Sequence, residues 1–287
     1  SIVIPTWNNL AFLKLCIQSI QRNSYYNHQI IVHVNDGSDG TLEWIKKAGI
    51  DYTHSEQNIG VCFAMNMMRT KVKTDYILFL NDDMYVLPFW DKVLYDEIEK
   101  LSDNYFFLSA TSIQPHTQSA STILANYGVS IETFQEDKLL KEYMNYKIIQ
   151  PNFVHRDMWD LVGGYSIEYS PGMYSDPDFT AKLYMCGVRF MKGLQASRIY
   201  HFETKSTTRI RKNCGQMQFL LKWGMTSSTF RKVFTYKGKD FKSQKIGTFK
   251  TGNRFKISLI RGRLKAIFYL LTKDFGPLWK FWKKTFV

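Results

Sequence analysis

Acidic side chains occur at two places where they could do chemistry. The run Asn81-Asp82-Asp83 follows an apolar stretch, and Ser175-Asp176-Pro177-Asp178 has the pattern of a helix start. Adjacent carboxylates at a strand end commonly hold Mg²⁺ or Mn²⁺ and present it to a diphosphate. A carboxylate at a helix start is a fixed place for a general base. Both patterns also fit purely structural roles, because these residue types favour turns and the first turns of helices.

The segments around these acids alternate between strand and helix patterns. Strands are expected at residues 2–5, 30–34, 51–54, 76–80 and 105–113, and helices at 10–22, 41–48, 60–71 and 88–101. The expected fold class is therefore α/β: a doubly wound, mostly parallel sheet with helices on both faces. Ligands of such sheets lie beyond the carboxyl ends of the strands. The polar clusters at residues 6–8, 35–38 and 81–83 should thus converge on one crevice.

The alternation becomes irregular after about residue 114, where strands are expected near 121–131 and 148–154 and a helix near 176–187. We interpret residues 1–230 as one catalytic domain, with a nucleotide half at 1–113 and an acceptor half at 114–230. The sequence opens inside the apolar run Ile2-Val3-Ile4, so its first strand is expected to be cut short.

Four motifs follow one another in a characteristic order. They are Ile2-Val3-Ile4-Pro5-Thr6-Trp7-Asn8, Val34-Asn35-Asp36-Gly37-Ser38-Asp39-Gly40, Asn58-Ile59-Gly60 and Leu80-Asn81-Asp82-Asp83. Taken together, they resemble the signature of family-2 glycosyltransferases. The resemblance implies a GT-A fold and an inverting transfer of a sugar from a nucleoside diphosphate, with a UDP-sugar as the expected donor.

The resemblance also implies a donor site and a metal site. Asp36 would accept hydrogen bonds from the nucleotide base, and Asp83 would ligate Mn²⁺ or Mg²⁺ together with His201. The remaining donor-binding residues would be Pro5, Thr6, Asn8, Asn58, Gly60, Asn81 and Asp82. Without the resemblance, Asp36 reads as a turn residue and His201 as a packing residue between aromatic side chains.

Two positions depart from the family pattern at the donor site. Asn81 stands in place of the first acid of the metal motif, which keeps an oxygen ligand but removes a charge. Met65 stands where many relatives have an arginine that contacts phosphate. The charge of the diphosphate is therefore left to the metal or to another basic residue.

The second acidic segment resembles the catalytic segment of the family. Asp176 matches the general base and Asp178 the acid that supports it, while Ser175 replaces the usual glutamate. The preceding Gly163-Gly164-Tyr165 matches a glycine-rich turn on the acceptor side. Inversion by a single displacement needs one base, unlike the paired acids of a glycosidase.

The net charge of +13 is concentrated at the C-terminal end of the chain. Residues 231–287 contain 16 Lys and Arg and two acids, which gives +14, and residues 1–230 therefore carry −1. Aromatic and apolar residues alternate with the basic ones at 255–271 and 278–284, a pattern typical of helices that lie on anionic membranes. We expect two short helices here, because Gly262, Gly276 and Pro277 interrupt the pattern. The alternative is that the apolar side chains of this extension pack on the catalytic domain.

The expected protein is thus a peripheral glycosyltransferase in the cytoplasm, with a glycan or a lipid-linked acceptor, in surface polysaccharide or glycolipid synthesis. The four cysteines lie far apart and form no CxxC pair, which fits a reducing compartment. Two alternatives remain: a pseudoenzyme that only binds nucleotide-sugar, and a nucleic-acid-binding protein that uses the basic extension. A dinucleotide-dependent oxidoreductase is not expected, since no G-x-G-x-x-G turn follows the first strand.

Overall fold

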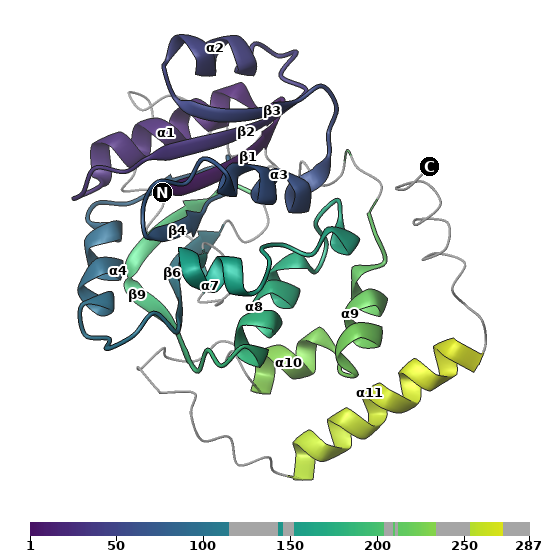
Figure 1. The fold of residues 1–287 in the computed structure, drawn as a ribbon. Helices are drawn as coiled ribbons and strands as arrows, with labels where there is room; N and C mark the ends of the chain where they lie inside the picture. Colours follow the sequence, from purple (N-terminus) through teal and green to yellow (C-terminus); the bar gives the residue numbers. More distant parts are fainter. Residues whose placement is uncertain (115–142, 146–151, 204–208, 210–211, 234–252, 272–287) are drawn as a thin grey trace.

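The structure is a computed structural model that describes residues 1–114, 143–145, 152–203, 209, 212–233 and 253–271 (Figure 1). The strand expected near residues 121–131 lies outside these ranges.

The first four strands form the parallel half of one sheet. They are β1 (Ile2–Trp7), β2 (Ile30–Asn35), β3 (Asp51–Ser55) and β4 (Tyr76–Phe79), in the order β3-β2-β1-β4. Helices α1 (Leu10–Asn23), α2 (Thr41–Lys47) and α3 (Gly60–Arg69) connect them. The predicted α/β fold is confirmed here, and each element lies within a few residues of its expected position.

The second half of the sheet is mixed, because antiparallel pairs accompany the parallel pair of β6 and β9. Its strands are β5 (Met84–Val86), β6 (Phe106–Gln114), β7 (Tyr143–Asn145), β8 (Asn152–His155) and β9 (Phe190–His201). Strand β8 lies between β4 and β6 and runs antiparallel to both, whereas β6 and β9 are parallel. Periodicity shows that a segment is a strand but not which neighbour it pairs with, so the insertion of β8 could not be predicted.

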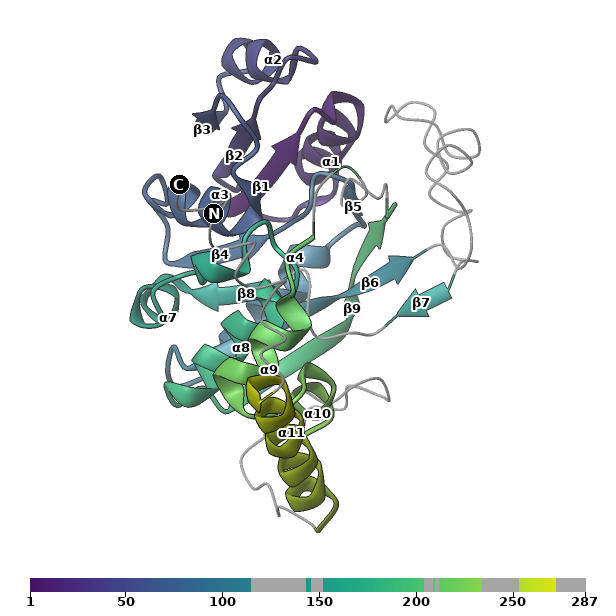
Figure 2. The ribbon, with the colours of Figure 1, turned by 90° about the vertical axis from the view of Figure 1, so that its right-hand side faces the viewer.

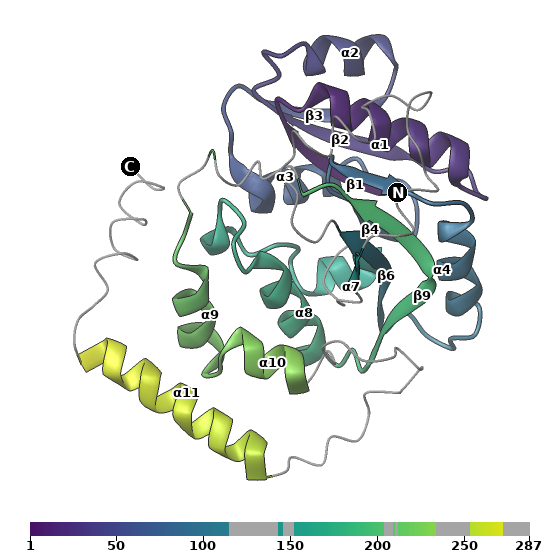
Figure 3. The ribbon, with the colours of Figure 1, turned by 180° about the vertical axis from the view of Figure 1, so that it is seen from behind.

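Helices cover both faces of the sheet because the side chains of each strand alternate between them. In β1, Val3 packs in one core cluster, while Ile2 and Ile4 pack in another. The first cluster lies under α3, α7 (Arg156–Leu161) and α8 (Ser175–Met185), which are in front in Figure 1. The second lies under α1 and α4 (Trp90–Ile98), which are in front in Figure 3. The core is thus split by a central sheet.

The C-terminal part of the described chain is helical. Helices α9 (Gly215–Trp223) and α10 (Ser227–Val233) pack near α8, and α11 (Asn253–Leu271) lies outside them (Figure 2). Helix α11 is one helix of 19 residues, so the expected break at Gly262 is wrong. A Cβ at Gly262 would lie 3.2 Å from the Gly224 carbonyl oxygen and 3.3 Å from the Met225 Cα. This glycine therefore lets α11 approach the α9–α10 turn closely instead of ending the helix.

None of the described helices combines the length and the apolar character needed to cross a lipid bilayer.

Candidate active site

A cavity of about 460 Å³ opens at the carboxyl ends of β1, β2 and β4. The convergence expected from the sequence is thus seen: side chains from separate strand ends line a single space. The predicted residues that line it are Pro5, Thr6, Asn58, Gly60, Asn81, Asp82, Asp83, Asp176 and His201.

Asp83 and His201 meet because β5 pairs with β9. Met84 lies opposite His201 in this antiparallel pair, so the residue before Met84 is brought to the end of β9. The His201 Nε2 atom lies 3.2 Å from the Asp83 Oδ1 atom and 3.4 Å from the Asn81 Nδ2 atom. Burial alone would lower the pKa of His201, but the Asp83 carboxylate outweighs burial and raises it.

Asp82 is buried beside this pair and accepts a hydrogen bond of 2.7 Å from the Thr6 hydroxyl. Burial, together with the adjacent Asp83 carboxylate, raises the pKa of Asp82. The side chain thus ties β1 to the acidic turn after β4.

The lining of the cavity is rich in acidic side chains. Its lining includes Asp82, Asp83, Asp176 and Glu203, and no Lys or Arg among the described residues. A diphosphate would be repelled here unless a cation accompanied it.

The donor set at Asp83 fits a divalent cation. The Asp83 carboxylate is a ligand type that suits Mn²⁺ or Mg²⁺, and the His201 imidazole beside it favours Mn²⁺ over Mg²⁺. Among the described residues, no three His, Cys, Asp or Glu side chains are grouped closely enough to hold a metal ion by themselves. The remaining ligands would therefore be phosphate oxygens of a donor and water.

Asp176 lies in the first turn of α8, on the wall of the same cavity. Its Oδ1 atom accepts a hydrogen bond of 3.0 Å from the Tyr165 hydroxyl, which itself accepts one of 2.9 Å from the Asn152 Nδ2 atom. The Tyr165 ring is buried and stacks on Phe179 at 4.9 Å. This chain of buried contacts fixes the position of the carboxylate.

The turn Gly163-Gly164-Tyr165 lies behind the cavity rather than in its lining. Asn66 pairs with the Tyr165 backbone through two hydrogen bonds of 2.8 Å. Gly164 has a φ of +63°, and a Cβ there would lie 2.4 Å from the Asn66 Oδ1 atom. The second glycine is therefore needed to let Asn66 hold Tyr165 in place.

Asp178 is fully buried and does not line the cavity. It accepts hydrogen bonds from the Ser166 hydroxyl and the Trp223 Nε1 atom, and its Oδ1 atom lies 2.9 Å from the Lys222 ammonium. These contacts tie α8 to α9 and to the turn after Tyr165.

Asn8 and Asp36 also lie outside the cavity lining. The Asn8 Nδ2 atom donates to Asp36 at 2.9 Å, and both residues have a positive φ. Hydrogen bonds from Ser38 and Asn8 lower the pKa of Asp36. The two side chains lie in the loops that follow β1 and β2, and their hydrogen bond holds these strand ends together.

Sequence reasoning missed the segment that precedes Asp176. Pro171, Gly172, Met173 and Tyr174 all line the cavity. This segment is held against α3, because the Val61 amide donates to the Pro171 carbonyl and Gly60 leaves no room for a Cβ against Pro171. Pro and Gly in a loop indicate a turn but not which cavity it faces, so the sequence carries no clear signal for it. Other lining residues outside the predicted set are Trp7, Asn35, Val61, Phe79, Ser175 and Glu203.

Curated relatives match a short part of this chain. GlyA, a glycosyltransferase of Streptococcus pneumoniae serotype 4, is 27% identical over 103 residues, which are 34% of this chain and 15% of GlyA. GlyG, a glycosyltransferase of the same organism, is 28% identical over 106 residues, which are 35% of either chain. The match thus covers about a third or less of these relatives.

Solved structures of S. aureus TarS share the fold. TarS 1–349 in complex with UDP-GlcNAc has a TM-score of 0.56 at 13% identity, covering 78% of this chain and 64% of that one. A second structure of TarS 1–349 has a TM-score of 0.54 at 14% identity and covers 77% of this chain and 64% of that one. At these identities the likeness concerns the fold.

The model of Glycosyl transferase family 2 matches residues 1–166, which is more than half of the chain and includes the strand ends that build the cavity. The chain belongs to glycosyltransferase family 2.

Proposed function

We propose that this chain is an inverting glycosyltransferase that moves a sugar from a UDP-sugar to an acceptor hydroxyl. One observation carries the proposal: a base held in place, Asp176, and the Asp83–His201 pair line the same cavity. A pseudoenzyme would not need the buried Tyr165 and Asn152 contacts that position Asp176.

The reaction is a single displacement. The acceptor hydroxyl gives its proton to Asp176 while its oxygen forms a bond to the anomeric carbon of the sugar. The bond between that carbon and the diphosphate oxygen breaks, and UDP leaves with the electron pair. A divalent cation at Asp83 and His201, when bound, neutralises charge that develops on the diphosphate. The sugar ends with inverted configuration because attack and departure occur on opposite sides.

UDP is the proposed nucleotide because TarS, which has the same fold, has been solved in complex with UDP and with UDP-GlcNAc. Arg209 is the basic residue that we propose in place of the arginine missing at Met65. Its guanidinium stacks on Trp7, which lines the cavity, at 4.4 Å, and it also donates to the Trp7 carbonyl. Its charge favours the ionised form of Asp82.

Residues 231–287 are proposed to bind an anionic membrane, with 1–230 as the catalytic domain in the cytoplasm. Seven large apolar side chains of α11 are between 47% and 77% exposed. Six of them recur at helical spacing and form one stripe: Ile257, Ile260, Leu264, Ile267, Phe268 and Leu271. Gly262, which docks α11, is two residues from Ile260 and from Leu264 and so lies on the opposite side of the helix. Basic residues and no acids accompany this stripe in α11, as an interfacial helix requires. The proposed acceptor is accordingly a lipid-linked or surface glycan.

Sedimentation with vesicles tests the membrane proposal. Leu264→Glu with Phe268→Glu should abolish binding to vesicles that contain phosphatidylglycerol, whereas Met185→Glu, at an exposed apolar residue of α8, should not. Equal binding by the parent, the double variant and Met185→Glu would contradict a role for α11.

Product analysis tests the reaction. NMR of the product formed from a UDP-α-sugar should show a β-linkage, and retention would contradict the mechanism. Asp176→Asn should bind UDP like the parent and lose about 10²-fold or more in turnover. Near-normal turnover by this variant would exclude Asp176 as the base, and UDP binding without turnover by the parent chain would indicate a pseudoenzyme.

A further inference from the structure

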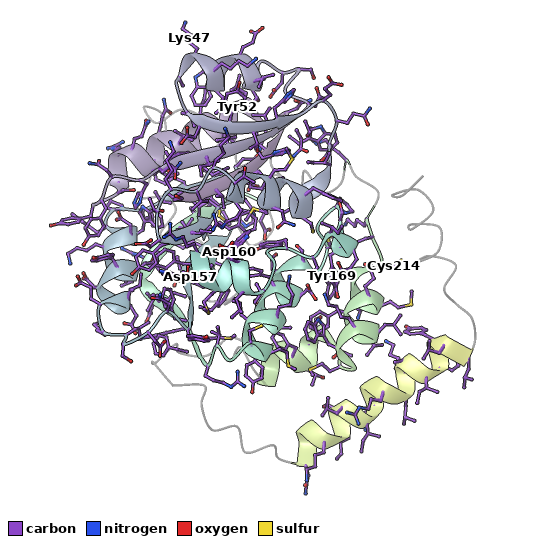
Figure 4. All side chains as sticks on the ribbon, in the orientation of Figure 1. Lys47, Tyr52, Asp157, Asp160, Tyr169 and Cys214 are labelled. Carbon is purple, nitrogen blue, oxygen red and sulfur yellow. The ribbon has the colours of Figure 1, made fainter. Side chains whose placement is uncertain are left out.

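A second cavity adjoins the proposed reaction cavity. It has a volume of about 410 Å³ and lies between the start of α9 and the helix α11. Met173 and Tyr174 line both cavities, and Tyr174 is two residues before Asp176. Figure 4 labels Cys214, which immediately precedes α9 and marks the place of this second cavity in the fold. A molecule bound there could extend past Tyr174 to the proposed base.

The wall between the two cavities is held rigidly. The buried Asn213 side chain exchanges hydrogen bonds with the Met173 amide and carbonyl, and it also donates to Gln218. Gly215 packs on Met173 so closely that a Cβ would lie 2.1 Å from the carbonyl oxygen. The second cavity therefore has at least one preformed wall.

The two cavities differ in charge. The first is lined by four acids, whereas the described lining of the second contains Lys212 and Lys265 and no acid. The two lysines come from different parts of the chain, one before α9 and one from α11. A negatively charged group is therefore favoured in the second cavity and disfavoured in the first.

The rest of the lining is amphipathic. Tyr269 and Leu220 offer apolar surface, and the Lys265 ammonium lies 5.7 Å from the centre of the Tyr269 ring. Such a lining suits a ligand that combines an anionic group with a sugar or a polyol, because ring faces pack on C–H groups while ammonium groups contact the anion.

We propose that this second cavity is the acceptor subsite and that it binds an acceptor with a phosphate group close to its reactive hydroxyl. The proposal rests on the proposed function, since it needs Asp176 as the base. It gives α11 two roles: Lys265 and Tyr269 line the subsite, while the exposed apolar stripe is the proposed membrane contact.

Methyl NMR of ¹³C-methionine protein tests the subsite without any assay of activity. Met217 lines only the second cavity, Met173 lines both, and Met158 is buried in the core as a reference. Glycerol 3-phosphate should shift the Met217 signal in a saturable way, while glycerol should not. Lys212→Gln and Lys265→Gln should each weaken this binding about tenfold, the loss expected for one charge-assisted hydrogen bond. Lys256→Gln is the matched control, because it removes the same charge from α11 outside the cavity.

Two results would overturn the subsite: no shift of Met217 at tens of millimolar glycerol 3-phosphate, or an equal loss of binding in Lys256→Gln. Titration with dihexanoyl phosphatidic acid separates the sources of the phosphate. Tighter binding than glycerol 3-phosphate assigns it to a lipid-linked acceptor, and equal binding assigns it to a water-soluble one; both support the subsite. A separate titration with UDP and Mn²⁺, followed at Met173, tests the donor site, so failure of the proposed function is distinguishable from failure of the subsite.

Discussion

The substitution Asp178→Asn separates a structural role of this acid from a catalytic one. Asp178 is fully buried. It accepts hydrogen bonds from the Ser166 hydroxyl and the Trp223 indole N–H, and it forms an ion pair with the Lys222 ammonium. Asparagine has the same shape and keeps one oxygen for Trp223, but it loses the charge that Lys222 faces. Lys222 retains its contact to Glu168 at 2.8 Å, so the loss is partial.

We therefore expect Asp178→Asn to lower the free energy of unfolding by about 2–3 kcal/mol, the range for hydrogen bonds to a charged group. For a chain of this size the melting temperature should fall by about 5–10 °C. UDP binding and turnover, measured well below that temperature, should stay within a few-fold of the parent, since Asp178 does not line the cavity.

The control is Asp157→Asn, at a side chain that is 61% exposed. It removes the same charge, and exposed pairs contribute little, so its melting temperature should hardly change. Loss of turnover in Asp178→Asn with an unchanged melting temperature would refute the structural role and return Asp178 to the catalytic machinery.

Three further predictions follow from single contacts. Tyr165→Phe removes the hydrogen bond to Asp176. In steady-state kinetics it should lower kcat about tenfold or more and leave the KM for the donor unchanged. An equal change in kcat and KM would contradict a positioning role. Gly60→Ala should lower the free energy of unfolding by about 1–3 kcal/mol in thermal denaturation, because the added Cβ would lie 2.6 Å from the Pro171 Cα atom. Gly49→Ala is the control and should cost less, because Gly49 also has a positive φ but has open space around it. Burial alone raises the pKa of Asp91, but hydrogen bonds from a histidine ring and two amides outweigh it and lower the pKa. The stability that Asp91 contributes is therefore present above its unfolded pKa of about 3.9 and lost as the pH falls further. Urea titrations should show that the difference in free energy of unfolding between the parent and Asp91→Asn shrinks below about pH 4. A difference that stays constant with pH would contradict this.

The elements of the first half could be predicted because each follows from local pattern. The apolar runs of β1 and β4 identify strands whatever the rest of the chain does. Which strands β8 and β9 pair with could not be predicted in this way, because the order of strands in a sheet does not affect the periodicity of each strand. The pairing of β9 with β5 brings His201 to Asp83, so that contact was expected only from the family resemblance and not from spacing.

Gly262 and Asp178 show how packing decides the surroundings of a residue. Gly262 suggested a helix break because glycine costs helix stability, but close packing against Gly224 and Met225 makes a small residue necessary there. The family resemblance gave Asp178 a role in support of Asp176. In the structure its side chain is buried outside the cavity lining, because a spacing of two residues in a helix places the two side chains on different sides. Burial decides such cases, and burial depends on the α9 packing that the sequence did not reveal.

Calorimetric titration of UDP in the presence and absence of Mn²⁺, with the parent chain and Asp83→Ala, tests the central claim most directly. The acidic cavity should bind UDP only when Mn²⁺ is present, and Asp83→Ala should weaken that binding by at least about tenfold. Equal affinity of the parent and Asp83→Ala for UDP with Mn²⁺ present would contradict the assignment of this cavity as a metal-assisted nucleotide-sugar site.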